Sequence, residues 1–393
     1  MKKYLIDIYN TINKLPAANQ RARLHEPFFF GKEKEYLNDC IQTTFVSTSG
    51  KYIKQFENKL ANFTKAKNAI AVINGQAGLE ISLRVLGVKD NDEILIPSIT
   101  FVATAFAVSH CNAIPHFIDS NKNNLGICHI KLKKYLSKNL KKKGNYYVNK
   151  KTKRRVFAII PVHVFGHIAN MDEIKKISKF YKLKVIEDAA EAIGSYYKNK
   201  HAGTIGDVGV ISFNANKTIT SGGGGIILTN NNKLAKKISY ISNNSKEKHN
   251  WSYLHKEIGW NFRLPNLNAA VGLAQLKNLK KILKYKKDLA SYYKKKFTHI
   301  KNIEIVKGSN KCKSNNWLNA IKVNFKTIKE RNNFLNEIIK KHECRPLWTL
   351  LHKLPMYSRC PRDKMQTAIS LEKKIITLPS GAKYGKNLLK AKA

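Results

Sequence analysis

Val185-Ile186-Glu187-Asp188-Ala189-Ala190-Glu191 runs from an apolar stretch into a carboxylate and then into small residues. A helical pattern over 172–181 precedes it, and another apolar run, 156–161, precedes that helix. Strand, helix and strand in this order are typical of neighbouring parallel strands joined by a crossover helix. The stretch therefore predicts one unit of an open α/β sheet, with polar residues at the carboxyl end of a strand.

The same alternation continues on both sides of this unit. Apolar Ile53, Phe56 and Leu60 fall at helical spacing within 51–63, and a second helical pattern covers 76–86. Further short apolar runs are expected to be buried strands at 69–73, 93–96, 184–187, 208–213 and 225–228. Together they predict an α/β fold whose largely parallel sheet is covered by helices on both faces.

The pattern changes after about residue 268. A long helical pattern runs through Leu273, Leu276, Leu279 and Leu283, and a mixed α+β stretch with a helix over 328–339 follows. A chain of 393 residues with 43% hydrophobic content is also long enough for more than one domain. We expect a large domain with an N-terminal arm over 1–267 and a smaller C-terminal α+β domain over 268–393.

The charge is unusual, since 72 Lys and Arg against 26 Asp and Glu give a formal net charge of +46. Such a basic chain invites a nucleic-acid interpretation. However, the lysines are spread throughout, and the densest stretch, 131–155, only interrupts the alternation of strands and helices. We therefore expect a solvated, lysine-rich surface without a nucleic-acid partner, whose positive field attracts an anionic, diphosphate-bearing substrate.

Location and thiol chemistry follow from what the sequence lacks. No run approaches the roughly 20 apolar residues of a membrane span, and the first ten residues carry charges and no cleavage site, so a cytoplasmic protein without a membrane partner is expected. The six cysteines lie far apart, without the short spacing of metal or redox pairs. Reduced thiols and no metal site are predicted.

Asp188 ends one of the predicted strands. A buried carboxylate is costly unless a cation or several donors pair with it. The ring nitrogen of pyridoxal 5'-phosphate (PLP) is such a partner, because a neighbouring carboxylate keeps the pyridine protonated and able to accept electrons. The alternative is that Asp188 caps a following helix.

Lys217 closes the segment Ser212-Phe213-Asn214-Ala215-Asn216-Lys217, which follows another apolar run. Only a neutral amine attacks an aldehyde to form a Schiff base, and a site of low dielectric favours that form. Lys217 follows Asp188 at a distance that leaves room for one turn, one connection and one further strand. Its position, not its residue type, makes it the candidate.

Other polar or aromatic residues also follow predicted strands. In Asn74-Gly75-Gln76-Ala77-Gly78, small residues let the N–H groups of a helix N-terminus approach a phosphate, although a plain turn explains them equally well. His163 follows 156–161 as either a functional or a structural histidine. Phe101 could belong to the core or stack on a flat ring such as pyridine.

Taken in order, these motifs resemble the DegT/DnrJ/StrS family of sugar aminotransferases over about residues 24–380. The resemblance rests on 74–75, 97–104, the His163 segment, 187–191, 212–217 and 259–266. Three further stretches, Leu24-His25-Glu26-Pro27, 345–350 and 354–357, resemble the branch that aminates C4 of nucleotide-linked 4-keto-6-deoxy-N-acetylhexosamines on the way to legionaminic-acid-type sugars.

The resemblance implies an aspartate-aminotransferase-like fold of type I, PLP as cofactor, and a homodimer with shared sites. Lys217 would be the Schiff-base lysine and proton carrier, and Asp188 would pair with the pyridine nitrogen. The remaining implied cofactor contacts are Phe101 stacked on the ring, Gly75, Gln76 and Ser212 on the phosphate, Asn261 from the partner subunit, and Glu191 near the phenolic oxygen or the substrate. The candidate substrate residues are His163, Glu191, Arg345 and Trp348.

The expected reaction moves an amino group from glutamate, which leaves as 2-oxoglutarate, to the C4 keto group of a nucleotide-linked 4-keto-6-deoxy-(N-acetyl)hexosamine. The product would be an amino sugar of a bacterial surface. A related PLP enzyme acting on another keto-sugar position is the alternative within the class. A basic nucleic-acid-binding or regulatory protein is the alternative from another class.

Overall fold

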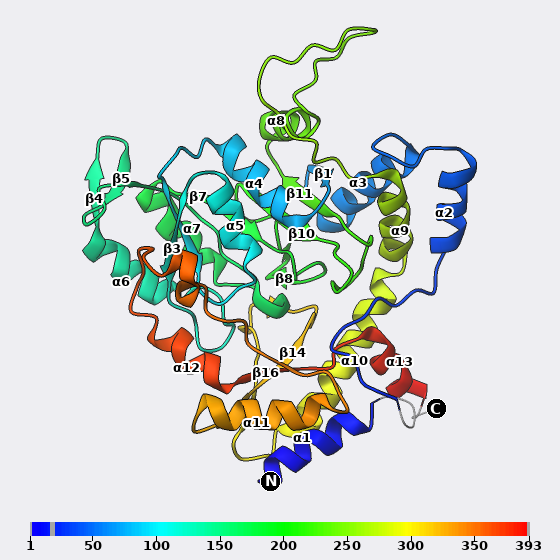
Figure 1. Ribbon diagram of the computed structural model, residues 1–393, viewed down its shortest axis with the longest axis vertical. Helices are drawn as coiled ribbons and strands as arrows, with labels where there is room; N and C mark the ends of the chain where they lie inside the picture. Colours follow the sequence, from blue (N-terminus) through cyan, green and yellow to red (C-terminus); the bar gives the residue numbers. More distant parts are fainter. Residues whose placement is uncertain (1, 16–19, 391–393) are drawn as a thin grey trace.

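The computed structural model describes residues 2–15 and 20–390, and a nine-stranded sheet forms its centre (Figure 1). Its main path follows the order β1-β11-β10-β7-β6-β2-β3. These strands are β1 (Asn68–Val72), β2 (Glu93–Pro97), β3 (Ile114–Ile118), β6 (Arg155–Ile159), β7 (Lys184–Asp188), β10 (Val208–Ser212) and β11 (Gly225–Thr229).

Strand direction confirms the predicted α/β fold. The neighbours from β10 through β7, β6 and β2 to β3 are all parallel, and β11 alone on the main path runs antiparallel to its neighbours β1 and β10. Every residue of β2, β10 and β11 is buried. Burial on both faces explains why these strands appear in the sequence as continuous apolar runs.

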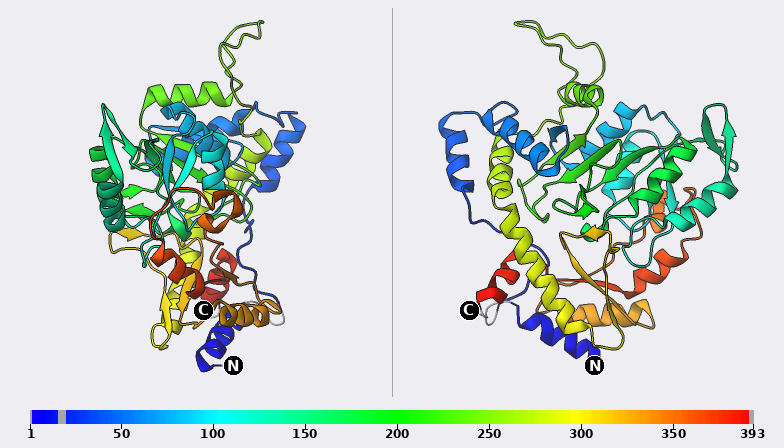
Figure 2. Two further views of the ribbon diagram at one scale, coloured as in Figure 1. Left: turned by 60° about the vertical axis from the view of Figure 1, so that its left-hand side comes forward. Right: turned by 180° about the vertical axis from the view of Figure 1, so that it is seen from behind.

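Helices cover both faces of this sheet (Figures 1 and 2). One face packs against α3 (Lys51–Thr64), α6 (His129–Asn139), α7 (Met171–Tyr181) and α9 (Asn266–Lys277). The other packs against α4 (Gly75–Leu86), α5 (Ala103–His110) and α8 (Asn232–Ser242). Within α3, the predicted stripe of Ile53, Phe56 and Leu60 is buried, as expected of an amphipathic helix.

The lysine-rich stretch 131–155 is an addition at the sheet's margin. It contains most of α6 and a hairpin of β4 (Leu140–Lys143) and β5 (Tyr146–Asn149), and β5 pairs antiparallel with β6. Leu132, Leu136 and Leu140 are buried, whereas Lys141, Lys142 and Lys143 are exposed. The lysines of this hairpin therefore face solvent.

A second, antiparallel sheet lies in the C-terminal part, in the order β12-β14-β16-β15. Its strands are β12 (Ile303–Ile305), β14 (Asn319–Val323), β15 (Arg345–Pro346) and β16 (Ile375–Leu378). The helices of this part are α10 (Leu279–Phe297), α11 (Ile328–Ile339), α12 (Gln366–Lys374) and α13 (Ala382–Lys390), with single 3-10 turns at Leu351–Lys353 and Pro355–Tyr357. The long predicted helix through Leu273 and Leu283 is divided into α9 and α10 at Asn278, whose side chain bonds back to the carbonyl of Ala274.

Segments of the N-terminal and C-terminal parts pack against each other and form one small sheet together. Helix α1 (Lys3–Asn13) buries Leu5, Ile8 and Ile12 among C-terminal residues, and α2 (Glu33–Gln42) packs on α9. A small sheet joins β13 (Cys312–Lys313) to β8 (Tyr196–Tyr197) and β9 (Lys200–His201). The division at 267/268 thus stays a prediction, because segments from both sides of it pack together.

Within residues 2–15 and 20–390, no helix is long and apolar enough to cross a membrane.

Candidate active site

The carboxyl ends of β7, β10 and β1 meet at one edge of the large sheet. β7 and β10 are parallel neighbours and end in Asp188 and Ser212. β1 and β10 both run antiparallel to β11, so β1 ends at the same edge, just before Asn74 and Gly75. In open α/β sheets this edge is where ligands bind.

Asp188 is held by donors on two sides. Its Oδ2 accepts a hydrogen bond from the Thr104 hydroxyl at 2.7 Å, and its Oδ1 accepts one from the Ala190 N–H at 3.1 Å. Residues 189–195 form turns, so Asp188 does not cap a helix there. A carboxylate has about four lone-pair sites, which leaves Asp188 able to accept a further donor.

Gly75 places the N-terminus of α4 against Ser212. A Cβ built on Gly75 would lie 3.1 Å from the Ser212 Cβ and 3.5 Å from its Oγ, so a side chain there would crowd the serine. Asn74 caps the helix by accepting from the Ala77 N–H at 2.8 Å. The N–H groups at the start of a helix have no partner within it, so Gly75 and Gln76 present donors beside a serine hydroxyl.

Lys217 lies between a carboxylate and an indole. Its Nζ is 3.5 Å from Glu191 Oε1 and 4.2 Å from the centroid of the Trp317 ring, and only 12% of the lysine side chain is exposed. The Trp317 Nε1–H donates to the Asn216 carbonyl at 2.7 Å. The indole therefore holds the backbone next to the lysine and contacts its amine.

Glu191 is buried, and burial raises the pKa of its carboxyl to about 7 although the charge of Lys217 opposes that shift. Its Oε2 accepts from the Phe165 N–H at 2.8 Å. Phe165 has a left-handed backbone with φ of 56°, which is uncommon for a non-glycine residue. Glu191 can thus hold or release a proton beside Lys217 near neutral pH.

Asn315 ties this group to the C-terminal part. Its Nδ2 donates to the carbonyls of Glu191 and Ile193, both at 2.9 Å, and lies 3.1 Å from the Thr218 hydroxyl. Its Oδ1 accepts from the Trp317 N–H at 2.9 Å. One amide side chain thereby fixes the surroundings of both Glu191 and Lys217.

Lys286 of α10 forms a hydrogen bond with the backbone of Trp317. It is fully buried, and its Nζ donates to the carbonyls of Trp317 at 3.1 Å and Ser380 at 2.7 Å and lies 3.0 Å from His25 Nε2. Burial lowers the pKa of this amine to about 7. This lysine therefore joins the N-terminal segment, Trp317 and the chain after β16.

His163 is fully buried and pairs with Glu187, with Nε2 2.9 Å from Oε2. Burial acts to raise the pKa of Glu187, but the hydrogen bond with His163 and backbone N–H groups from 203–206 outweigh it and hold the pKa below its ordinary value. The Ala169 N–H donates to His163 Nδ1. The geometry thus gives His163 structural partners, and a role in substrate binding stays a prediction.

The remaining predicted residues lie at separate places in the structure. Phe101 is 55% exposed just before α5, so it does not belong to the core. Trp348 packs its ring 5.2 Å from that of Phe165, while Arg345 is exposed on β15. Asn261 is exposed and pairs with Asn243 at the base of a loop that projects from the body in Figures 1 and 2, and within the described chain no hydrogen bond joins it to the group around Lys217.

Three residues of this group escape sequence reasoning. Thr104 lies on the first turn of α5, within a motif noted only for its resemblance, and its partner Asp188 is 84 residues away. Asn315 and Trp317 sit in a polar stretch without helical or strand periodicity. They directly follow β13, which pairs with β8, and no local pattern signals that pairing.

The DegT/DnrJ/EryC1/StrS aminotransferase family model matches residues 30–390. The chain is 35% identical over 360 residues to GDP-perosamine synthase of Escherichia coli O157:H7, covering 91% of this chain and 92% of that protein. It is 32% identical over 253 residues to the UDP-4-amino-4,6-dideoxy-N-acetyl-beta-L-altrosamine transaminase of Campylobacter jejuni, covering 64% of this chain and 63% of that one.

Among solved structures, the chain resembles Helicobacter pylori PseC, an aminotransferase involved in the biosynthesis of pseudoaminic acid. The TM-score is 0.84 at 23% identity, over 94% of this chain and 99% of that one. This likeness confirms the predicted aminotransferase fold.

Proposed function

Since the chain belongs to the DegT/DnrJ/EryC1/StrS aminotransferase family and is a PLP-dependent sugar aminotransferase, we propose that it moves an amino group from glutamate to the C4 keto group of a nucleotide-diphosphate-linked 4-keto-6-deoxy-(N-acetyl)hexosamine. The observation that carries the proposal is the placement of Lys217 Nζ beside Glu191 at the strand edge that also holds Asp188.

The residues at this edge fit the cofactor. Asp188 offers a buried carboxylate to a protonated ring nitrogen, and the start of α4 with Ser212 offers donors to a phosphate. Phe101 offers an exposed ring for stacking. Bound there, PLP would supply an aldehyde that takes up amines and a ring that accepts electrons.

Lys217 would both anchor the cofactor and transfer protons. Its Nζ is the one amine within reach of Glu191 in the described chain, and its side chain is largely shielded from water. An amine in this position can take up a proton at Nζ and return it during the exchange. Because glutamate gives up its amino group and 2-oxoglutarate leaves before the keto-sugar takes that group at the same site, we expect ping-pong kinetics.

Two neighbours would tune this amine. The Glu191 carboxyl has a pKa of about 7, so it can share a proton with Nζ at neutral pH. The Trp317 ring lies against the Nζ and stabilises a cationic amine through its π face. Trp317 and Glu191 are therefore proposed as residues that position the Lys217 amine.

The choice of sugar rests on the relatives. The name of the Campylobacter jejuni relative describes a UDP-linked 4-amino-4,6-dideoxy-N-acetyl sugar, and that of the Escherichia coli relative names a GDP-linked sugar. Both names support a nucleotide-linked sugar, and the first supports reaction at C4. His163, Arg345 and Trp348 remain candidate substrate contacts, and the ring of Trp348 packs at a tilt against that of Phe165, whose N–H donates to Glu191.

We also propose a homodimer with shared sites. The projecting loop between Asn243 and Asn261 exposes large apolar side chains, among them Trp251 at 82% and Ile258 at 83% exposure. Exposed apolar patches of this kind mark contact surfaces. A partner subunit would cover them, and Asn261 at the base of the same loop would reach the partner's cofactor phosphate.

The test is product analysis by mass spectrometry. The purified enzyme is incubated with PLP, glutamate carrying an isotope-labelled amino nitrogen, and a panel of UDP- and GDP-linked 4-keto sugars, with the Lys217→Ala variant as control. The proposal expects the label in one nucleotide sugar, and NMR of that product locates the amine on C4. An amine on another carbon would replace the C4 assignment, and transfer to none of the sugars would reject the substrate class.

A further inference from the structure

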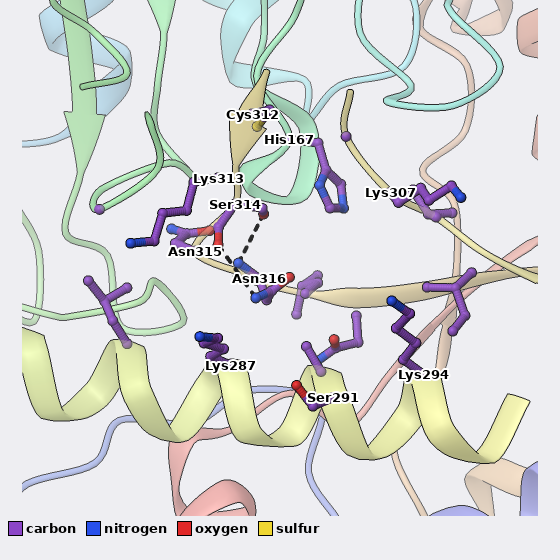
Figure 3. A pocket seen from close by; sticks show the side chains of 18 of the residues that line it. His167, Lys287, Ser291, Lys294, Lys307, Cys312, Lys313, Ser314, Asn315 and Asn316 are labelled. Atoms are coloured by element: carbon purple, nitrogen blue, oxygen red, sulfur yellow. Dashed lines mark hydrogen bonds between the residues drawn. The ribbon is translucent and has the colours of Figure 1, made fainter. Parts of the chain in front are cut away.

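A cavity lies outside the group of residues around Lys217. It has a volume of about 740 Å³ and lies between α10 and the segment 305–320 (Figure 3). Asn315 lines it and also contacts Glu191, so this residue stands between the cavity and the candidate active site. The basic residues that line the cavity are Lys280, Lys284, Lys287, Lys294, Lys307 and Lys313.

Lysines cover the face of α10 that borders the cavity. Lys280, Lys284, Lys287 and Lys294 recur at helical spacing, with Ser291 between the last two. In Figure 3, Lys287 and Lys294 rise from α10 on one side of the cavity. These lysines are exposed, and together they place a row of cationic groups along one border of the cavity.

The lysines that line the cavity have no ion-pair partner in residues 2–15 and 20–390. Among the residues that the structure describes, no carboxylate lines the cavity. The other polar lining groups are serine hydroxyls and asparagine amides, which can donate hydrogen bonds. The lining thus matches an anion.

His167 adds a buried group with an unused nitrogen. The side chain is only 5% exposed, and its Nδ1 has no hydrogen-bond partner in the described part of the chain. Burial lowers the pKa of this imidazole to about 4, so the ring is neutral at neutral pH. In Figure 3 it points toward α10, between the two lysine-bearing walls. Buried polar atoms in native proteins nearly always have a partner, and an occupant of the cavity would provide one.

Apolar side chains complete the lining. Leu283, Val306 and Leu318 border the cavity together with the ring of Tyr196. A bare inorganic anion makes no use of such surface, whereas a nucleoside has a flat base and a sugar that do. The volume falls within the range of about 300–1,000 Å³ found for small-molecule sites.

We propose that this cavity binds a small organic anion that carries a diphosphate, of the nucleoside diphosphate class, at a site separate from Lys217. The lysines of α10 and of 307–313 contact the diphosphate, and the apolar residues contact the nucleoside. The proposal goes beyond the aminotransferase function and does not depend on which keto-sugar is the substrate.

The test compares two pairs of lysines on the same helix. Lys287→Gln with Lys294→Gln removes two charges from the cavity. Lys281→Gln with Lys295→Gln removes two exposed charges of α10 that do not line it. Binding of UDP and of inorganic pyrophosphate to the PLP-loaded enzyme is measured by isothermal titration calorimetry at physiological salt.

We expect the cavity pair to weaken UDP binding about tenfold or more, since charge-assisted contacts are lost, and the control pair to change it less than about twofold. Tighter binding of UDP than of pyrophosphate supports contacts to the nucleoside, and equal binding reduces the site to one for diphosphate. Equal losses in both variant pairs would mean a general charge effect and would overturn the proposal, as would the absence of binding by either probe.

A second measurement locates the ligand. Lysine acetylation followed by peptide mass spectrometry is performed with and without UDP. The cavity predicts protection of Lys287, Lys294 and Lys307 while Lys281 and Lys295 stay reactive. Protection that spares all three cavity lysines would place UDP elsewhere, at the substrate site for example, and reject the assignment.

Discussion

Glu191 and Lys217 face each other across 3.5 Å in a site from which water is largely excluded, and the carboxyl titrates near neutrality because it is buried. With a pKa of about 7, the Glu191 carboxyl can act either as an acid or as a base beside the Lys217 amine. This relationship leads to the first prediction.

Glu191→Gln should change how stability depends on pH. The carboxyl has a pKa of about 7 in the fold against 4.5 when unfolded, so between these values the native state binds more protons. The free energy of unfolding of the parent apoprotein should therefore fall, relative to the variant, as pH rises from about 4.5 to 7, by about 3 kcal/mol. Urea unfolding of both proteins across this range measures the difference. Parallel profiles would show that Glu191 is not perturbed.

Borohydride reduction should fix the cofactor to the peptide that contains Lys217. Reduction turns a covalent imine between an amine and the aldehyde into a stable secondary amine, and Lys217 is the partly buried amine beside Asp188's strand edge. Peptide mass spectrometry identifies the labelled residue. Lys286, whose pKa burial lowers to about 7, is the internal comparison because it is buried among carbonyls, and a label there would overturn the assignment.

Asp188→Asn should bind PLP but lower turnover at least about 100-fold, because an amide cannot stabilise the charge of a protonated ring nitrogen. Thr104→Val is the matched variant, since it removes the 2.7 Å hydrogen bond to Asp188 yet leaves the carboxylate in place. Its turnover should fall less. The turnover of both variants is measured under steady-state conditions with glutamate and the accepted keto-sugar. A normal rate for Asp188→Asn would contradict the pairing of Asp188 with the ring nitrogen.

Asn315→Ala should destabilise the fold and disturb the site together. The substitution removes donors from the carbonyls of Glu191 and Ile193 and the acceptor of the Trp317 N–H, all of them buried. Leaving such groups unsatisfied costs about 1–3 kcal/mol each, so a clear drop in the denaturant midpoint is expected. Asn310→Ala, an exposed asparagine of the same segment, is the control. Equal stability of the two variants would show that the Asn315 contacts carry little energy.

The sequence predicts several strands of the large sheet well for a physical reason. β2, β10 and β11 are buried on both faces, so each appears as an uninterrupted apolar run, and the predicted bounds fall within two residues of the observed ones. Strand β3 was not predicted because Pro115 and His116 interrupt its apolar run. The surroundings of Lys217 could not be predicted either. Asn315 and Trp317 are about 100 residues from it in the sequence and come close to it next to the pairing of β13 with β8.

The last prediction concerns assembly and depends on the loop that ends at Asn261. In the described chain, Asn261 forms no hydrogen bond with the group around Lys217. Instead, it pairs with Asn243 at the base of the loop. If Asn261 serves the partner subunit's cofactor phosphate, an Asn261→Ala chain and a Lys217→Ala chain are each defective in a different half of a shared site. Mixing them should restore activity, because a two-fold hybrid dimer contains one site with both residues intact.

Two controls make the mixing experiment decisive. Subunit exchange is first shown with differently tagged chains, and Asn261→Ala alone must be clearly impaired. A Trp251→Ser variant, which removes an exposed indole from the same loop, should weaken the dimer in analytical ultracentrifugation and lower the activity that mixtures recover, since the indole is 82% exposed in the single chain. With exchange established, mixtures no more active than the sum of the separate variants would mean that Asn261 acts within its own subunit or not at all, because a shared site cannot stay incomplete in every hybrid dimer.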